Sequence, residues 1–212
     1  MTDSALRDQV VLLGRSLYER GYTHGSTGNI SVKTEDGWLL SPTNSCLGRL
    51  DPAKLSRMSW EGRLLDGDPP SKEAFLHLAM YQERASFEAI VHLHSTYSTA
   101  VSTLVEIDPD DALPPLTAYY VMRVGRLPVV PYFKPGDTAL AAAVGNAARK
   151  HHALLLANHG PVVAGTSLSA AVDAVEELEQ TARLFLLLRG EKIRALTLEQ
   201  TDDLRRACPP PP

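Results

Sequence analysis

The 212 residues suffice for an α/β domain with a substantial core, and 44% hydrophobic with 22% charged residues is an ordinary globular composition. The net charge of −4 gives no basic footprint, so a nucleic-acid partner is not expected. No apolar run approaches the roughly 20 residues that cross a bilayer, and the polar N-terminus lacks a signal-peptide pattern, so no membrane association is expected.

The N-terminal part of the chain predicts a helix, two hairpins and a second helix. Apolar residues at helical spacing predict a helix over residues 3–20. Alternating residues on either side of the turn at 35–37 predict one hairpin, and residues 55–66 predict another. Ser71 follows a Gly/Pro break and is expected to cap a helix that runs to about residue 84.

The C-terminal part predicts mostly helices around two buried strands. Helices are expected over 95–104, 138–150 and 167–189, with a short strand at 128–132. His151 and His152 are interpreted as a solvated helix end. No interdomain linker is evident, which predicts one domain over residues 1–200. Cys208 and the four prolines after it predict a disordered tail over 201–212.

The cysteine content indicates a reducing environment. Cys46 and Cys208 cannot form a disulfide framework, and no Cys-x-x-Cys motif is present. A cytoplasmic location is therefore expected. Cys46 could be a thiol nucleophile, but a loop cysteine without an evident partner is more often incidental.

Two short apolar runs carry the histidines of greatest interest. Residues 89–94 read as a buried strand, and side chains two apart on a strand share a face, so His92 and His94 project together. Residues 153–158 read as a second buried strand, with His159 on the turn that Gly160 and Pro161 indicate.

If the two strand ends lie side by side, three imidazoles converge and leave an open coordination position, as in catalytic zinc sites. A single His-x-His pair is otherwise explained by buried histidines that bond to the backbone.

Two further segments could bind an anion. The turn Gly25-Ser26-Thr27-Gly28-Asn29 offers hydroxyls and accessible N–H groups, although it is neither a Walker A nor a Gly-x-Gly-x-x-Gly motif. Ser71 and Lys72 open the predicted helix, whose first turn also favours anions. Glu73 beside them is either an acid/base residue or a carboxylate that stabilises the helix dipole.

These motifs, taken in order, resemble the class II aldolase/adducin family. The ordered set is Gly-Ser-Thr-Gly-Asn, Ser41-Pro42-Thr43-Asn44, Pro70-Ser71-Lys72-Glu73, His92-x-His94 and Asn158-His159-Gly160. It spans roughly residues 5 to 190. Each motif alone is weak, and their order gives the resemblance its strength.

The resemblance implies a three-layer α/β/α sandwich with a largely antiparallel central sheet, and a homotetramer with active sites at subunit interfaces. It implies that His92, His94 and His159, with Glu73, bind Zn²⁺ or another divalent cation such as Mn²⁺ or Co²⁺. Glu73 would also be the acid/base residue. A tyrosine of a neighbouring subunit would donate a proton, and both Tyr119 and Tyr120 are candidates. The residues implied around a substrate phosphate are Ser26, Gly28, Asn29, Thr43, Asn44 and Ser71.

Lys72 is the main departure from the sugar-phosphate aldolases, which usually read Pro-Ser-Ser-Glu. An extra cation beside the phosphate site suits a substrate carboxylate, although an exposed first-turn lysine that points to solvent is the alternative. The Lys variant, with residues 77–81 after it, is most similar to the sugar-acid branch of the family, which contains the 3-oxo-tetronate 4-phosphate decarboxylases.

The resemblance therefore predicts a zinc-dependent carbon–carbon lyase that converts a 3-oxo-tetronate 4-phosphate to dihydroxyacetone phosphate and carbon dioxide. Retro-aldol cleavage of a fuculose or rhamnulose 1-phosphate makes the same demand on the cation, because both reactions need a Lewis acid for developing negative charge. A sugar-phosphate epimerase and a methylthioribulose-phosphate dehydratase are also family members. A non-enzymatic scaffold like the adducin head is the alternative of another class, and it would not need the metal ligands.

Overall fold

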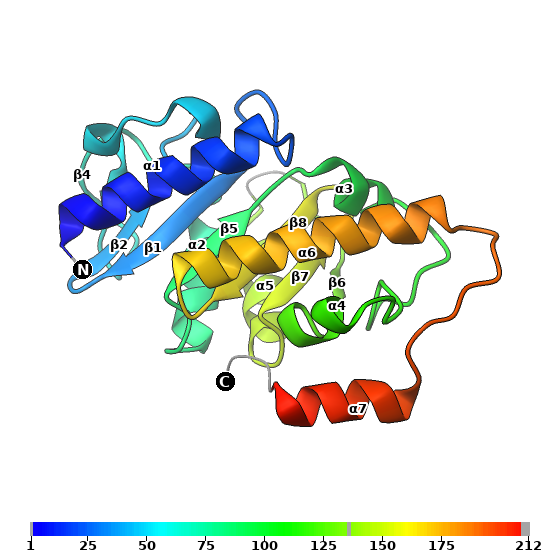
Figure 1. Ribbon diagram of the computed structural model, residues 1–212. Helices are drawn as coiled ribbons and strands as arrows, with labels where there is room; N and C mark the ends of the chain where they lie inside the picture. Colours follow the sequence, from blue (N-terminus) through cyan, green and yellow to red (C-terminus); the bar gives the residue numbers. More distant parts are fainter. Residues whose placement is uncertain (1, 135–136, 209–212) are drawn as a thin grey trace.

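An eight-stranded sheet in the order β4-β3-β2-β1-β5-β8-β7-β6 forms the centre of the structure, a computed structural model that describes residues 2–134 and 137–208 (Figure 1). All neighbouring strands are antiparallel except β6 and β7. The strands are β1 (Asn29–Thr34), β2 (Gly37–Leu40), β3 (Ser56–Met58), β4 (Leu64–Asp66), β5 (Ala89–His92), β6 (Val129–Val130), β7 (Ala153–Leu156) and β8 (Gly160–Gly165).

Helices cover both faces of this sheet. The described helices are α1 (Asp3–Glu19), α2 (Ala74–Glu83), α3 (Thr96–Ser102), α4 (Ala118–Arg123), α5 (Ala139–Ala148), α6 (Leu168–Leu187) and α7 (Leu198–Ala207), with 3₁₀ turns at Leu47–Arg49 and Pro52–Lys54. α1 and α6 lie across one face (Figure 1), whereas α2 packs with α5 on the other.

The central strands are apolar on both faces because helices lie on both sides. In β5, Ala89 and Val91 belong to the core under α1 and α6, and Ile90 between them belongs to the core under α2 and α5. Alternate residues of a strand point to opposite faces, so a strand in the middle of three layers is apolar throughout. The predicted α/β/α fold class is confirmed.

Most of the predicted local elements are present. The helix over 3–20 is α1, capped by Thr2, and the hairpins around 35–37 and 55–66 are β1–β2 and β3–β4. Ser167 caps the long helix α6 through a bond from the Ala170 N–H.

β5 and β7, the two strands whose ends carry the histidines, are not direct neighbours, because β8 lies between them and pairs with both. Gly160 and Pro161 indicated only a break, yet β8 begins at them. Pro161 has no N–H and cannot donate a hydrogen bond to the sheet. Its carbonyl still accepts the Leu93 N–H at 3.2 Å, so β8 remains paired at this residue.

Two C-terminal expectations also need correction. Residues 201–207 of the predicted disordered tail belong to α7, because Thr197 and Gln200 form a capping box and Leu204 packs on the core. Residues 209–212 lie outside the described part of the chain. His152 is buried rather than solvated, and its Nδ1 donates to the Ala164 carbonyl at 3.0 Å.

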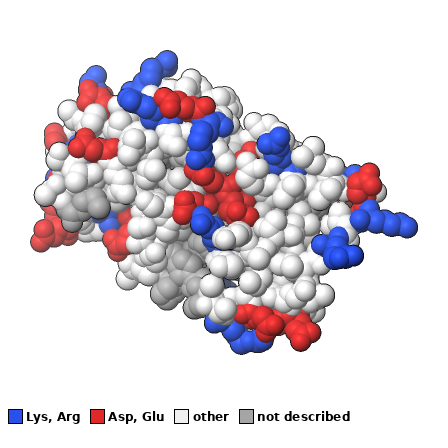
Figure 2. All heavy atoms as spheres, in the orientation of Figure 1, with Lys and Arg blue, Asp and Glu red and all other residues white. Residues whose placement is uncertain are grey.

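The surface agrees with the modest net charge. On the face drawn in Figure 2, the described Lys and Arg side chains are scattered among Asp and Glu rather than gathered into one basic patch. Among the described residues, no helix has both the length and the apolar character needed to span a membrane.

Candidate metal centre and substrate pocket

The β5–β8 pairing brings the three histidines together. β5 ends at His92, which is paired with Val162 of β8, and His94 follows two residues later. His159 lies in the tight turn that joins β7 to β8. The three rings lie with their centroids 4.5–5.0 Å apart.

The turn that carries His159 depends on two unusual backbone conformations. Asn158 has φ +56° and Gly160 has φ +152°. A Cβ atom at position 160 would lie 2.3 Å from the Leu93 carbonyl oxygen and 3.3 Å from His94 Cα. Only glycine therefore lets the His159 turn approach the His94 segment this closely.

We expect Gly160→Ala to lower the free energy of unfolding by about 3 kcal/mol, because the new Cβ meets backbone rather than a movable side chain. Gly190→Ala is the matched control: Gly190 has φ +88° but nothing within 4 Å of the added Cβ, so a loss of about 1 kcal/mol is expected. Denaturant titration measures both. Equal losses would show that the close approach to Leu93 does not matter.

Glu73 reaches the histidines from a turn before α2. The predicted cap is misplaced: α2 starts at Ala74, and the Ser71 hydroxyl instead accepts the Glu73 N–H at 3.3 Å. Asn29 lies opposite His92 in the β1–β5 ladder, and its Nδ2 donates to Glu73 Oε2 at 2.7 Å. Ser71 and Asn29 thus hold a carboxylate that a regular first helical turn would not have placed there.

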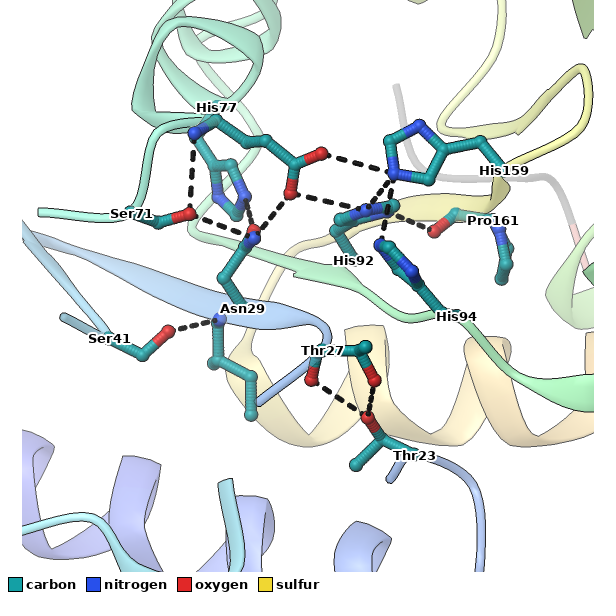
Figure 3. Close-up of polar contacts among 12 residues, drawn as sticks. Thr23, Thr27, Asn29, Ser41, Ser71, His77, His92, His94, His159 and Pro161 are labelled. Carbon is teal, nitrogen blue, oxygen red and sulfur yellow. Dashed lines mark hydrogen bonds and ion pairs between the residues drawn. The ribbon is translucent and has the colours of Figure 1, made fainter. Parts of the chain in front are cut away.

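The four side chains form one compact cluster, of which Figure 3 labels the three histidines. Glu73 Oε1 lies 3.1 Å from His159 Nε2, and Glu73 Oε2 lies 3.3 Å from His92 Nε2. His159 Nε2 is also 3.3 Å from His92 Nε2 and 2.9 Å from His94 Nε2. One ligand atom from each of the four residues lies within 4.8 Å of all the others.

The donor set fits a divalent cation. His92 Nδ1 donates to the Pro161 carbonyl at 2.8 Å, which leaves the Nε2 lone pair for the centre of the cluster. Three imidazole nitrogens and one carboxylate are the ligands that zinc and similar ions prefer. Four nitrogen and oxygen ligands so close together are therefore well arranged to share a cation.

The charges of the cluster are strongly coupled. Burial alone would raise the pKa of Glu73, but the charge on His92 and the hydrogen bonds from His159 and His92 hold this pKa far below its usual range. Burial opposes a charge on His92, yet Glu73 and the Pro161 carbonyl raise the pKa of His92. Burial and the neighbouring histidines lower the pKa of His94 to about 3. Glu73 thus favours a proton on His92, whose Nε2 is the atom that would ligate a cation.

We expect metal binding to release that proton. His92 Nε2 must lose it to become a ligand, so release should be present at about pH 6 and fade as the pH rises through the raised pKa of His92. His94, already neutral, should release none. Glu73→Gln removes the carboxylate that raises the pKa of His92, so in this variant proton release should disappear at a lower pH. Calorimetry in buffers of different ionisation enthalpy measures the release; identical pH profiles for both proteins would contradict this account.

A cavity of about 740 Å³ opens beside the cluster. Every residue expected around a substrate phosphate lines it, namely Ser26, Gly28, Asn29, Thr43, Asn44 and Ser71. Lys72, Glu73, His94 and His159 line it as well, whereas His92 is fully buried behind them. Gly28 has φ +78°, and a Cβ there would lie 2.8 Å from the His92 carbonyl oxygen, so the loop packs directly against β5.

Several pocket residues had no signal of their own in the sequence. Tyr132 and Phe133 follow β6 and form an aromatic wall, and Thr99 reaches the pocket from α3. His24 also lines the pocket, and its position immediately before the Gly25–Asn29 loop could have indicated it. Distant segments supply these residues, so only the packing of the chain reveals them.

The two candidate tyrosines lie outside the pocket of their own chain. Both are on α4, which packs against α6 and α7. Tyr119 is 61% exposed, and Tyr120 is 1% exposed with a hydroxyl that has no hydrogen-bond partner. Neither tyrosine is among the residues that line the cavity.

Residues 8–186 match the family described as Class II Aldolase and Adducin N-terminal domain, and the chain belongs to this family. The family resemblance drawn from the ordered motifs is thus confirmed.

Relatives with this fold cover nearly the whole chain. A 3-oxo-tetronate 4-phosphate decarboxylase of Haemophilus influenzae is 54% identical over 96% of this chain and 98% of its own length. An L-fuculose phosphate aldolase of Methanocaldococcus jannaschii is 38% identical over 85% of this chain and 96% of its own. The crystal structure of YgbL from Klebsiella pneumoniae superposes with a TM-score of 0.95 and 48% identity, covering 97% of this chain and 100% of that one.

Proposed function

We propose that this chain is a divalent-metal-dependent carbon–carbon lyase that decarboxylates a 3-oxo-tetronate 4-phosphate to dihydroxyacetone phosphate and carbon dioxide. One observation carries the proposal: a single cavity is lined by Glu73, His94 and His159 of the metal cluster, by a loop of N–H and hydroxyl donors, and by Lys72. These three features suit the ketone, the phosphate and the carboxylate of such a substrate. The 54% identical relative of that name supports the choice of substrate.

The reaction breaks the bond between the carboxylate carbon and its neighbour. The bonding electrons move toward the ketone oxygen, carbon dioxide leaves, and the carbon that lost it takes up a proton. A cation held by His92, His94 and His159 would supply Lewis-acid stabilisation of the charge that develops on that oxygen. Glu73 is proposed to hold or move the proton, and the Gly25–Asn29 loop to fix the phosphate.

Aldol cleavage is the competing function, and the 38% identical L-fuculose phosphate aldolase favours it. A substrate panel separates the two. Purified protein with added Zn²⁺ is incubated with phosphorylated 3-oxo acids and with ketose 1-phosphates, and the products are identified by mass. Metal-dependent carbon dioxide with dihydroxyacetone phosphate supports the decarboxylase. Reversible aldehyde formation without carbon dioxide would assign an aldolase, and no product with an intact metal site would favour another family activity.

Lys72 is proposed to recognise the substrate carboxylate. It is exposed at the rim of the pocket, next to Glu73 and Ser71. We expect Lys72→Ser to raise the KM for the acid substrate by about 10-fold or more, because a charge-assisted hydrogen bond is lost. Its effect on weak turnover of a ketose phosphate, which has no carboxylate, should be smaller. Steady-state kinetics on both substrates test this, and equal effects would assign Lys72 to the phosphate instead.

Zinc is the proposed ion, because three imidazoles with a carboxylate form a typical zinc donor set. Mn²⁺ and Co²⁺ are the alternatives that metal analysis of the purified protein would distinguish. We also propose one domain over residues 1–200 and a cytoplasmic location, with Cys46 and Cys208 both free as a reducing compartment requires.

A homotetramer with active sites between subunits is proposed from family membership. The proton donor would then come from a neighbouring subunit, which agrees with the absence of both tyrosines from the lining of their own pocket. Tyr119 is the better candidate of the two, because its exposed side chain can reach another subunit and the buried Tyr120 cannot.

A further inference from the structure

His77 is a fully buried histidine of α2 that does not line the pocket, yet it connects to it. Its Nε2 lies 2.5 Å from Asn29 Oδ1, and its Nδ1 lies 2.6 Å from Ser31 Oγ. Ser31 Oγ is also 2.7 Å from the Tyr81 hydroxyl. Asn29 and Ser31 are two apart on β1 and so share the face that α2 covers. Figure 3 shows the His77 ring beside Asn29.

The proton positions along this chain follow from Glu73. An ionised carboxylate only accepts hydrogen bonds, so Asn29 must present its Nδ2 to Glu73 Oε2, at 2.7 Å. The Asn29 Oδ1 then faces His77. Because a carbonyl oxygen only accepts, His77 Nε2 must carry the ring proton.

The rest of the chain follows in the same way. Burial and the charge of His92 lower the pKa of His77 to about 3, so its ring is neutral and Nδ1 accepts a hydrogen bond. Ser31 therefore donates to His77 and accepts from Tyr81, whose phenol stays protonated because burial raises its pKa. Every donor from Tyr81 to Asn29 points toward Glu73, and hydrogen bonds aligned in this way strengthen one another.

We propose that His77 is a positioning residue for the metal centre: as its Nε2–H tautomer, it holds the Asn29 amide so that Nδ2 donates to Glu73 and keeps the carboxylate aimed at His92 and His159. Without His77, Asn29 Oδ1 loses its donor, and the amide is held only by the bonds of Nδ2 to Glu73 Oε2 and to Ser71 Oγ at 3.1 Å, so the position of the Glu73 carboxylate is less well defined. This inference rests on the metal centre of the proposed function, but not on the substrate.

The first test is made on the unaltered protein. Long-range ¹H–¹⁵N correlation spectra of protein with ¹⁵N-labelled histidine report which ring nitrogen carries the proton, and the His77 signals are assigned by their loss in His77→Gln. We expect the Nε2–H tautomer. An Nδ1–H tautomer would make Nε2 an acceptor, would require the opposite amide orientation at Asn29 and would overturn the proposal, whatever the enzyme's substrate is.

The second test measures metal affinity rather than turnover. Zn²⁺ competition with a chromophoric chelator should show an affinity 10–100-fold weaker in His77→Leu, the range for lost partners of metal ligands. His77→Gln should recover most of the loss, because its amide can again donate to Asn29 Oδ1. His152→Leu is the matched control: it also removes a buried histidine, but one that bonds to Ala164 and does not line the pocket.

The outcomes separate the two proposals. An affinity in His77→Leu within twofold of the unaltered protein, or one lowered equally in His152→Leu, would assign His77 to the core alone. If the unaltered protein binds no Zn²⁺ at all, the metal centre is wrong, while the tautomer experiment still decides the role of His77. If His77→Leu does not fold, the tautomer and the affinity of His77→Gln, expected close to that of the unaltered protein, decide instead.

Discussion

Replacing His94 with alanine should abolish metal binding and reduce carbon dioxide release by at least about 10³-fold. His94 Nε2 lies 2.9 Å from His159 Nε2 and lines the cavity, so the change removes a ligand on the substrate side of the cluster. Lewis-acid stabilisation is worth several kilocalories per mole, and each 1.36 kcal/mol is about tenfold in rate. Metal content by mass spectrometry and carbon dioxide release measure the two effects.

His151→Ala is the matched control, because His151 precedes β7 and does not line the pocket. It should keep both metal and activity. Substantial activity in metal-free His94→Ala would show that carbon dioxide release does not need the proposed cation, and the proposed metal dependence would then fail. Normal metal content with lost activity would instead indicate that His94 contacts the substrate and is not a metal ligand.

Replacing Glu73 with glutamine should slow carbon dioxide release by about 10²–10⁴-fold, the range for a general acid or base. Glutamine keeps the size of the side chain and can still accept the Asn29 hydrogen bond, but it removes the negative charge beside His92 and His159. The affinity for metal should also fall. Turnover measured at saturating metal separates the catalytic loss from the loss of affinity.

Glu83→Gln controls for charge removal on the same helix. Glu83 is at the end of α2 remote from the pocket and pairs with Arg149 at the surface, so this variant should be nearly as active as the unaltered protein. If Glu73→Gln recovers full turnover once metal saturates, Glu73 is a ligand only. The proton must then come from another group, for which Tyr119 of a neighbouring subunit is the candidate.

Much of the secondary structure could be predicted from local sequence patterns, because interactions between residues close in the sequence determine those elements. The helical patterns of α1 and α6 and the turn at 35–37 each act within a few residues. The two apolar runs that became β5 and β7 were recognisable in the same way, since only buried strands need such composition.

Other features depended on contacts that no local pattern contains. The sequence pattern predicts that α2 begins after Ser71, but the helix begins at Ala74. Glu73 bonds instead to Asn29 of β1 and to the histidines, which are distant in the sequence. β8 begins with a glycine and a proline, which locally indicate a break. It forms because β5 and β7 offer it ladder partners on both sides.

The sequence by itself determined that His92 and His94 project together, since the period of an extended chain puts residues two apart on one face. It also indicated, through the order of its motifs, the family to which the chain belongs. Only the tertiary structure decided that His159 meets them, because that depends on β8 pairing with β5 and on the absence of a Cβ at Gly160. The role inferred for His77 arises in the same way: β1 places Asn29 opposite His92, and α2 packs His77 against it, so segments far apart in the chain define one chain of hydrogen bonds.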